Sequence, residues 1–197
     1  MTTYQELLNR IRNDSRYLAN LDWGKPRNGH PEGTVRAHIA ELETNLARLA
    51  LEKDDDYWKL MLLIHVHDSF KKDSAKGVPI DHPRSHASLA RQFFSDYSGD
   101  GDLLSMIQLH DEPYALYRQQ AQKGHFNQGR LAALRGAIKD WRLFLRFLLI
   151  DGCTDGKSRE PLLWSFQNLA EPLGLGELMS EGLHLLRDQA RVGQGLS

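Results

Sequence analysis

The sequence lacks several features that would point directly to a class of protein. It has one cysteine, Cys153, in 197 residues, so no intrachain disulfide can form and a disulfide-built scaffold is excluded. Lysine and arginine together number 25, and aspartate and glutamate 26, which leaves a formal net charge of −1. A chain with so little excess charge has no global basic field with which to gather nucleic acid or an anionic membrane.

Long hydrophobic runs are absent as well. The longest are Leu60–Ile64 and Phe147–Ile150, far short of the roughly 20 residues that a membrane-spanning helix needs. Residues 1–21 are polar and amphipathic and lack the continuous apolar core of a signal peptide. We therefore expect a cytoplasmic protein with no membrane partner and no clear nucleic-acid surface, and the sequence leaves open whether it forms a homo-oligomer.

What the sequence does contain is helical periodicity almost throughout. Apolar residues recur every three or four positions, no segment alternates with period two, and no repeat or linker interrupts the chain. The fold class predicted is all-α, with residues 1–197 forming a single helical domain. The pattern predicts helices over residues 4–18, 35–49, 57–66, 83–97, 103–114 and 131–151, and two shorter ones around Trp164 and Leu183.

The helix over residues 57–66 differs from the others because it is apolar on almost every side. Asp54–Asp56 before it can cap its first turn, and Thr34 can cap the helix that follows it in the sequence. A helix that is hydrophobic all round belongs in the middle of a bundle. We therefore expect this helix to be buried, with His67 and Asp68 at its end.

Histidine and aspartate residues fall on the apolar stripes of five predicted helices. Side chains three or four residues apart share one helix face, so each of these residues is aimed at the packed side of its helix. They are His38, His67, Asp68, His86, His110 and Asp151.

Each of these residues alone has an ordinary interpretation. A single histidine on an apolar stripe is more often a hydrogen-bonded core residue than a ligand, and an acid at a helix end is usually solvated. An ionised Asp68 after a mostly apolar helix is, however, costly to bury unless it is paired or bound to metal. Five helices that each aim a histidine or an aspartate at their packed side favour one shared site. Imidazole and carboxylate together are donors suited to Mn, Fe, Co, Ni or Zn.

The order His38, His67-Asp68 and Asp151 resembles the HD superfamily of metal-dependent phosphohydrolases, whose ligands run His, His-Asp, Asp on a helical bundle. His30-Pro31-Glu32-Gly33-Thr34-Val35, followed by His38, is similar to the family's first-ligand region. Leu62 to Lys71 is similar to its apolar helix, HD pair and following lysine, although Phe70 stands where the family often has glycine. The resemblance covers roughly residues 30–155.

The resemblance implies a site for one or two divalent metal ions (Mn, Fe, Co, Ni, Zn or Mg). His38, His67, Asp68 and Asp151 would hold the first metal, and His86 and His110 would help to hold a second. Asp155 is an alternative last ligand, although Asp151 directly continues the apolar helix. The activity implied is hydrolysis of a phosphomonoester or phosphodiester, expected to be a nucleotide, by metal-activated water, with Asp68 bridging the metals or acting as a base.

Three further residues are predicted to bind the substrate phosphate. Lys71 would lie one turn past Asp68 if the helix continues, which places a cation near the phosphate. His82 and Arg84 precede His86 at the head of a predicted helix with Pro83 at its first position, where backbone N–H groups favour anions. Arg27, Glu32 and Lys157 are candidate rim residues of the site. Surface solvation is the preferred interpretation of all three.

Two other functions stay open. One is a regulatory module that binds metal or nucleotide without turnover, and the other is a di-iron oxygenase on a related helical scaffold. Residues 152–158 resemble a phosphate loop only superficially, since three residues separate the glycines where the motif needs four. Nothing nearby in the sequence marks Cys153 as an activated nucleophile.

Overall fold

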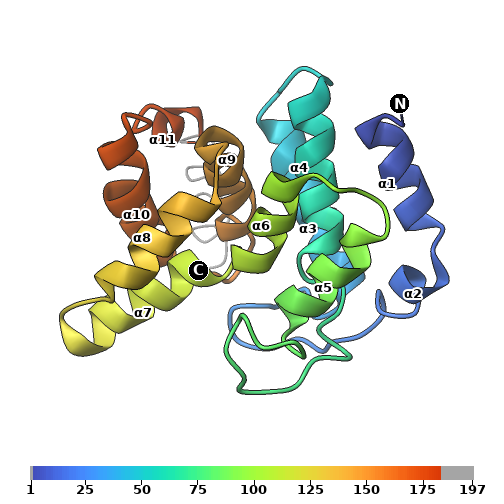
Figure 1. Ribbon diagram of the computed structural model, residues 1–197, viewed down its shortest axis with the longest axis horizontal. Coiled ribbons are helices and arrows are strands. Elements are labelled where there is room, and N and C mark those ends of the chain that lie inside the picture. Colours follow the sequence, from blue (N-terminus) through green and yellow to red (C-terminus); the bar gives the residue numbers. More distant parts are fainter. Residues whose placement is uncertain (1, 183–197) are drawn as a thin grey trace, which may run out of the picture.

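The computed structural model describes residues 2–182, and in that range all the regular elements are helices (Figure 1). The β structure of this range is limited to two isolated bridges in the loop before α3, Gly24–Thr34 and Arg27–His30. The α-helices are α1 (Tyr4–Arg12), α2 (Ser15–Leu18), α3 (Val35–Arg48), α4 (Asp55–Val66), α5 (His86–Ser95), α6 (Gly101–Leu109), α7 (Glu112–Lys123), α8 (Gln128–Ala137), α9 (Trp141–Gly152), α10 (Glu160–Ser165) and α11 (Leu178–Glu181). A π-helical turn, Phe166–Ala170, and a 3-10 turn, Glu171–Leu173, follow α10.

Helix α4 forms the centre of the first half of the molecule, as its apolar composition predicts. Every residue from Leu60 to Val66 is buried, and the helix packs against α1, α3, α5, α6 and α9. The side chain of Asp54 caps its first turn by accepting a hydrogen bond from the backbone N–H of Tyr57 at 3.1 Å. Burial on every side fixes the position of this helix in the bundle, and therefore the position of His67 and Asp68 at its end.

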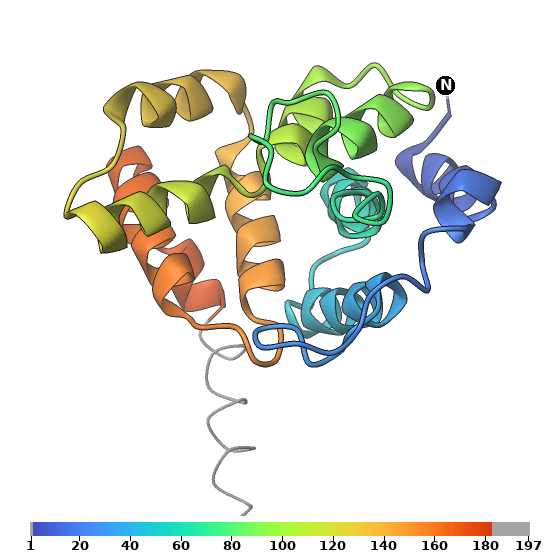
Figure 2. The same ribbon diagram turned by 90° about the horizontal axis from the view of Figure 1, so that it is seen from below.

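Helix α9 joins the two halves of the molecule. It packs against α3 and α4 on one side and against α10 and α11 on the other, and Figure 2 shows it between the two groups. The side-chain amide of Asn45 on α3 donates a buried hydrogen bond of 3.0 Å to the carbonyl of Ile150 near the end of α9. This bond ties together the two helices that carry His38 and Asp151.

Two of the predicted helices are each divided in the structure. The segment over residues 4–18 forms α1 and α2, because Asp14 accepts a hydrogen bond from the backbone N–H of Arg16 and so starts a new helix. The segment over residues 131–151 forms α8 and α9. The carboxylate of Asp102 accepts hydrogen bonds of 2.8 Å from the backbone N–H groups of Lys139 and Asp140 and so stabilises the break.

Two further helix boundaries differ from the predicted ones. Pro83 does not begin a helix, since α5 starts at His86, where the hydroxyl of Ser85 caps the backbone N–H of Ser88 at 3.0 Å. Pro113 lies in the first turn of α7, a new helix after α6 ends at Leu109. The short helix predicted around Leu183 lies outside the described residues.

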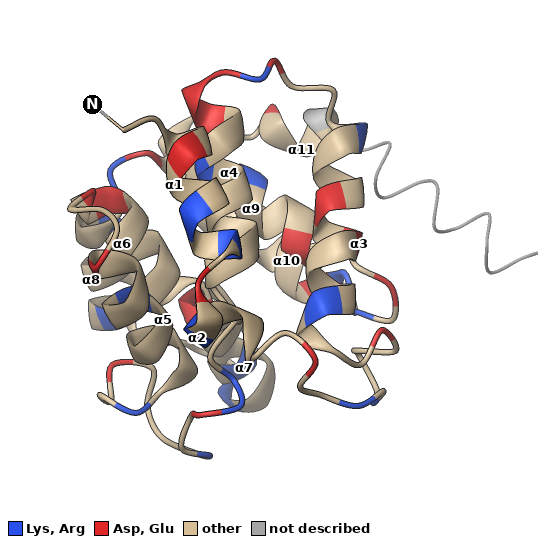
Figure 3. Cartoon of the chain, turned by 90° about the vertical axis from the view of Figure 1, so that its right-hand side faces the viewer, with Lys and Arg blue, Asp and Glu red and all other residues tan. Residues whose placement is uncertain are grey.

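The described helices are short or carry charges, and none has both the length and the hydropathy of a membrane-spanning segment. On the side drawn in Figure 3, basic and acidic positions are interspersed along the chain.

Candidate metal centre

The first part of the candidate site comes from α3 and the end of α4. Thr34 caps α3 by accepting a hydrogen bond from the backbone N–H of Ala37, and His38 follows in the first turn. His67 and Asp68 come directly after α4. All three side chains are buried, with 4%, 1% and 6% of their residue surfaces exposed.

Asp68 lies at the centre of the histidines, and each of its carboxylate oxygens faces two of them. Oδ2 is 3.4 Å from Nε2 of His67 and 3.9 Å from Nε2 of His38. Oδ1 is 3.6 Å from Nε2 of His86 and 3.5 Å from Nε2 of His110. The two pairs of histidines come from four different segments of the chain, so this arrangement exists only in the folded protein.

Two groups of side chains around Asp68 could hold a metal ion. The first is His38, His67 and Asp68, and the second is Asp68, His86 and His110; within each group the candidate donor atoms lie within 4.8 Å of one another. Asp68 belongs to both groups. The number and identity of the metals stay predictions.

Asp151 joins this cluster from the end of α9. Its Oδ1 lies 3.1 Å from Nε2 of His38 and 2.7 Å from Nζ of Lys157. Asp155 is exposed, and its backbone N–H donates to the carboxylate of Glu41. The geometry therefore favours Asp151 over Asp155 as the fourth donor.

Backbone carbonyls fix the ring orientation of two histidines. Nδ1 of His67 lies 2.9 Å from the carbonyl of Leu63, and Nδ1 of His110 lies 2.8 Å from the carbonyl of Ile107. A carbonyl only accepts, so Nδ1 carries the proton in each ring. In the neutral ring Nε2 then presents its lone pair to Asp68, which is the arrangement that a metal-binding histidine needs.

Several buried polar atoms of the cluster have no hydrogen-bond partner among the described residues. They include Nε2 of His38, Nε2 of His67 and Oδ1 of Asp68. Buried polar atoms without partners are rare and costly, and these three lie in one cluster of possible donors. A divalent cation would satisfy all of them, so the residues present fit a metal.

The charges of the cluster also suit a cation. Burial would raise the pKa of the Asp68 carboxyl, but the Lys71 ammonium beside it holds that pKa well below its usual range. Burial lowers the pKa of His67, which keeps its imidazole neutral. Burial also opposes protonation of His110, but the carboxylates of Asp111 and Asp68 raise its pKa to about 9. A metal at His110 would therefore displace a proton, which makes its binding depend on pH.

Two carboxylates at the site were not predicted as part of it. Oε1 of Glu32 lies 2.9 Å from Nδ1 of His30 and 3.1 Å from Nδ1 of His38, and its side chain is only 10% exposed. Oδ2 of Asp111 lies 3.2 Å from Nε2 of His86. Glu32 occupies a loop without periodicity, so no sequence pattern predicts that it lies at the site. Asp111 could have been predicted, because His110-Asp111 repeats the His-Asp dipeptide of His67-Asp68.

Surface solvation, the preferred interpretation of Glu32 and Lys157, is wrong. The side chain of Glu32 is largely buried against two histidines, and the ammonium of Lys157 pairs with Asp151 and lines the cavity described below. Both residues come from loops that the fold carries to the ends of α3 and α9. Their roles follow from this packing, which cannot be predicted from the spacing of apolar residues in the sequence.

The predicted phosphate-binding residues divide into two sets. Lys71 makes an ion pair with Asp68 and lines the cavity. His82 and Arg84 are exposed, do not line the cavity, and interact with each other through a 3.1 Å hydrogen bond from the Arg84 backbone N–H to Nδ1 of His82. The structure does not bring these two to the centre, because α5 begins only at His86 and they belong to the loop before it.

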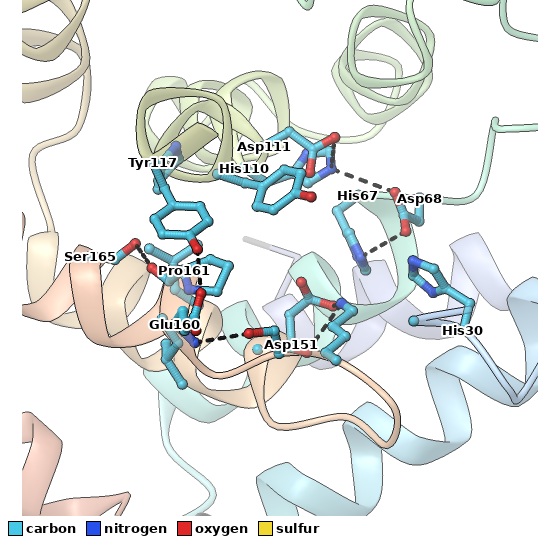
Figure 4. Close-up of a pocket in the computed structure, with 18 of the residues that line it drawn as sticks. His30, His67, Asp68, His110, Asp111, Tyr117, Asp151, Glu160, Pro161 and Ser165 are labelled. Atoms are coloured by element: carbon cyan, nitrogen blue, oxygen red, sulfur yellow. Dashed lines mark hydrogen bonds and ion pairs between the residues drawn. The ribbon is translucent and has the colours of Figure 1, made fainter. Parts of the chain in front are cut away.

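A cavity of about 520 Å³ opens beside the cluster. Figure 4 shows His67, Asp68 and His110 gathered on one side of it, with Tyr117, Glu160 and Pro161 on the other. Cys153 is buried and does not line this cavity, and burial raises the pKa of its thiol to about 11. A thiol with that pKa yields little thiolate near neutrality, which agrees with its rejection as a nucleophile.

Comparison of the chain with protein-family models, with curated proteins and with solved structures finds no match in any of the three. The function is therefore argued from the residues and geometry of this chain.

Proposed function

We propose that the protein is a metal-dependent phosphohydrolase of the HD type that cleaves a phosphomonoester or phosphodiester of a nucleotide. The observation that carries this proposal is the Asp68 carboxylate, which has two histidines at each oxygen and Lys71 beside it at the wall of a cavity. The ordered ligand set of the HD resemblance accounts for each of these residues.

In this proposal His38, His67, Asp68 and Asp151 hold one divalent metal, and His86 and His110 share Asp68 to hold a second. Metal ions of this kind supply Lewis-acid stabilisation of phosphoryl oxygens and lower the pKa of water towards neutrality. Asp111 lies next to His86 and His110 and adds negative charge on the same side.

Lysine side chains supply the positive charge that a phosphate group needs. Burial would lower the pKa of Lys71, but the carboxylates of Asp68 and Asp111 raise it, so the side chain stays an ammonium ion. Lys157 lines the same cavity from the loop after α9. Fixed cations beside the reacting group stabilise the charge that develops in phosphoryl transfer. Asp68 can orient the attacking water or take its proton through Oδ1, which accepts no hydrogen bond within residues 2–182.

The same donor set leaves one alternative of a different chemical class. Two clusters of histidine and carboxylate that share Asp68 would suit two irons as well as two hydrolytic metals, as a di-iron oxygenase requires. A regulatory module without turnover is less well supported, because all the predicted donors gather in one cluster and four of them, His67, Asp68, His110 and Asp151, line a cavity.

The test is elemental analysis of the purified, unchelated protein together with phosphate release from a panel of nucleotides under added Mn²⁺, Co²⁺, Ni²⁺ and Mg²⁺. Bis-p-nitrophenyl phosphate is included as a diester probe whose cleavage does not depend on free phosphate. We expect one or two metal equivalents and metal-dependent cleavage, both lost in His67→Ala and Asp68→Ala. His125→Ala removes an exposed histidine outside the cavity and should change neither quantity. Oxygen uptake without cleavage would favour the di-iron alternative, and a protein that neither retains nor rebinds metal would overturn the proposal.

A further inference from the structure

The cavity beside the metal centre has two chemically different ends. Figure 4 shows His67 and Asp68 on one side of it and Tyr117, Pro161 and Glu160 on the other. A phosphate group alone would occupy a small part of about 520 Å³, which is the size of sites that bind a whole small molecule. The far end is therefore available to the organic part of a substrate.

Tyr114 and Tyr117 both line this cavity and form an aromatic pair in its wall. They are one turn apart on α7 and share a face of the helix. Their ring centroids are 6.3 Å apart and their planes differ by 28°, so the two rings lie almost parallel. Tyr114 is 50% exposed, an unusual exposure for a large side chain at a cavity wall.

The position of this surface is fixed from two sides. The hydroxyl of Tyr117 donates a 2.7 Å hydrogen bond to the carboxylate of Glu160, and its ring packs against Trp164. At the start of α7, the buried side chain of Glu112 is held by Arg130. These contacts hold α7 and the Tyr117 ring in the wall of the cavity, and Leu148 and Leu162 add apolar lining to it.

We propose that Tyr114 and Tyr117 form the stacking surface for the base of a nucleotide whose phosphate lies at the metal centre; this rests on the proposed function. Aromatic ring faces in the wall of the cavity suit a flat heterocycle, which can stack on them. A quaternary ammonium group instead requires aromatic faces on several sides. Glu160 also lines this end and can accept hydrogen bonds from amino or hydroxyl groups of the nucleoside.

The proposal is tested by calorimetric binding of AMP, GMP, CMP, UMP, ribose 5-phosphate and phosphocholine to the protein as purified, followed by phosphate release from each. We expect at least one nucleotide to bind about tenfold or more tightly than ribose 5-phosphate, because base stacking on an aromatic side chain contributes on that scale. Tyr114→Ala should abolish the difference, and Tyr114→Phe should keep it. Truncation of a half-exposed side chain should leave the fold intact, which circular dichroism can check.

Equal binding of ribose 5-phosphate and all nucleotides would overturn this assignment, as would tighter binding of phosphocholine or no effect of Tyr114→Ala. These outcomes are separable from the proposed activity. Tyr114-dependent nucleotide binding without cleavage would support the stacking surface and contradict the hydrolase. Cleavage with no preference for a base, unchanged in Tyr114→Ala, would support the hydrolase and contradict the stacking surface.

Discussion

Nε2 of His38, on α3, lies 3.1 Å from Oδ1 of Asp151 at the end of α9, which closes the candidate centre across the two halves of the chain. The buried hydrogen bond from Asn45 to the carbonyl of Ile150 holds these helices together. Burial would raise the pKa of the Asp151 carboxyl, but Lys157 and His38 hold it well below its usual range. Asp151 is therefore a carboxylate at neutral pH and is available as a donor.

Asp151→Asn is expected to reduce the metal content of the purified protein by more than about tenfold, since an amide is a much poorer donor than a carboxylate. The matched variant is Asp155→Asn, four residues further on, which should retain its metal because Asp155 is exposed and lies outside the cavity. Elemental analysis after gel filtration measures both. Loss of metal in Asp155→Asn with retention in Asp151→Asn would reverse the assignment.

Lys71→Ala is expected to lower turnover by about 10²-fold, the usual effect of removing one preorganised electrostatic group, while the metal stays bound. The control is Lys72→Ala, because the neighbouring Lys72 is exposed and its ammonium contacts the backbone carbonyl of Ala19. Steady-state kinetics and metal content of the same preparations decide the outcome. Unchanged kinetics in Lys71→Ala would remove this residue from the mechanism.

Glu32→Gln is expected to weaken metal affinity by about 10–100-fold, because the carboxylate that faces Nδ1 of His38 orients that ring towards the centre. Glu32 also faces His30, and His30, Glu32 and His38 are close enough together to form a cation site of their own. Titration with Zn²⁺ against a competing chelator distinguishes the two roles. A weaker affinity at unchanged stoichiometry indicates orientation of His38, whereas loss of one equivalent would mean that Glu32 is itself a ligand. Glu52→Gln, at an exposed loop position, is the control.

The hydrogen bonds of Asp14 predict that the stability of the fold depends on pH at a place outside the metal centre. Hydrogen bonds from the side chain of Arg16, together with one from the Tyr97 hydroxyl, lower the pKa of the Asp14 carboxyl. The unfolded chain therefore takes up its proton first as the pH falls. The stabilisation is complete above about pH 5 and is lost progressively as the pH falls below the ordinary carboxyl pKa near 4.

Asp14→Asn tests this prediction, because asparagine caps a helix about as well as aspartate but carries no charge. Urea unfolding of the wild type and the variant between pH 7 and pH 3 is the measurement. The difference between their midpoints should narrow towards pH 3. Parallel curves over the whole range would show that the Asp14 carboxylate makes no such contribution.

Periodicity and composition predict that the chain is helical, which helix is buried, and which histidines and aspartates face inwards. Helical periodicity reports the face of a helix on which a residue lies, so the spacing of apolar residues was enough to assign His38, His67, His86 and His110 to packed faces. It also favoured Asp151 over Asp155, because only Asp151 continues an apolar stripe. The break between α8 and α9 was missed because the carboxylate that stabilises it, Asp102 on α6, comes from a distant position in the sequence. The break between α1 and α2 depends on a local cap, Asp14, which the spacing of apolar residues does not report.

How these faces meet could be seen only in the folded chain. It set Asp68 between two pairs of histidines, brought Glu32 and Asp111 to the cluster, and left His82 and Arg84 on the surface. The physical reason is that the rotation and spacing of one helix relative to another depend on side-chain packing across their whole interface. Loops such as the one that carries Glu32 have no periodicity at all, and their positions follow from the helices that they connect.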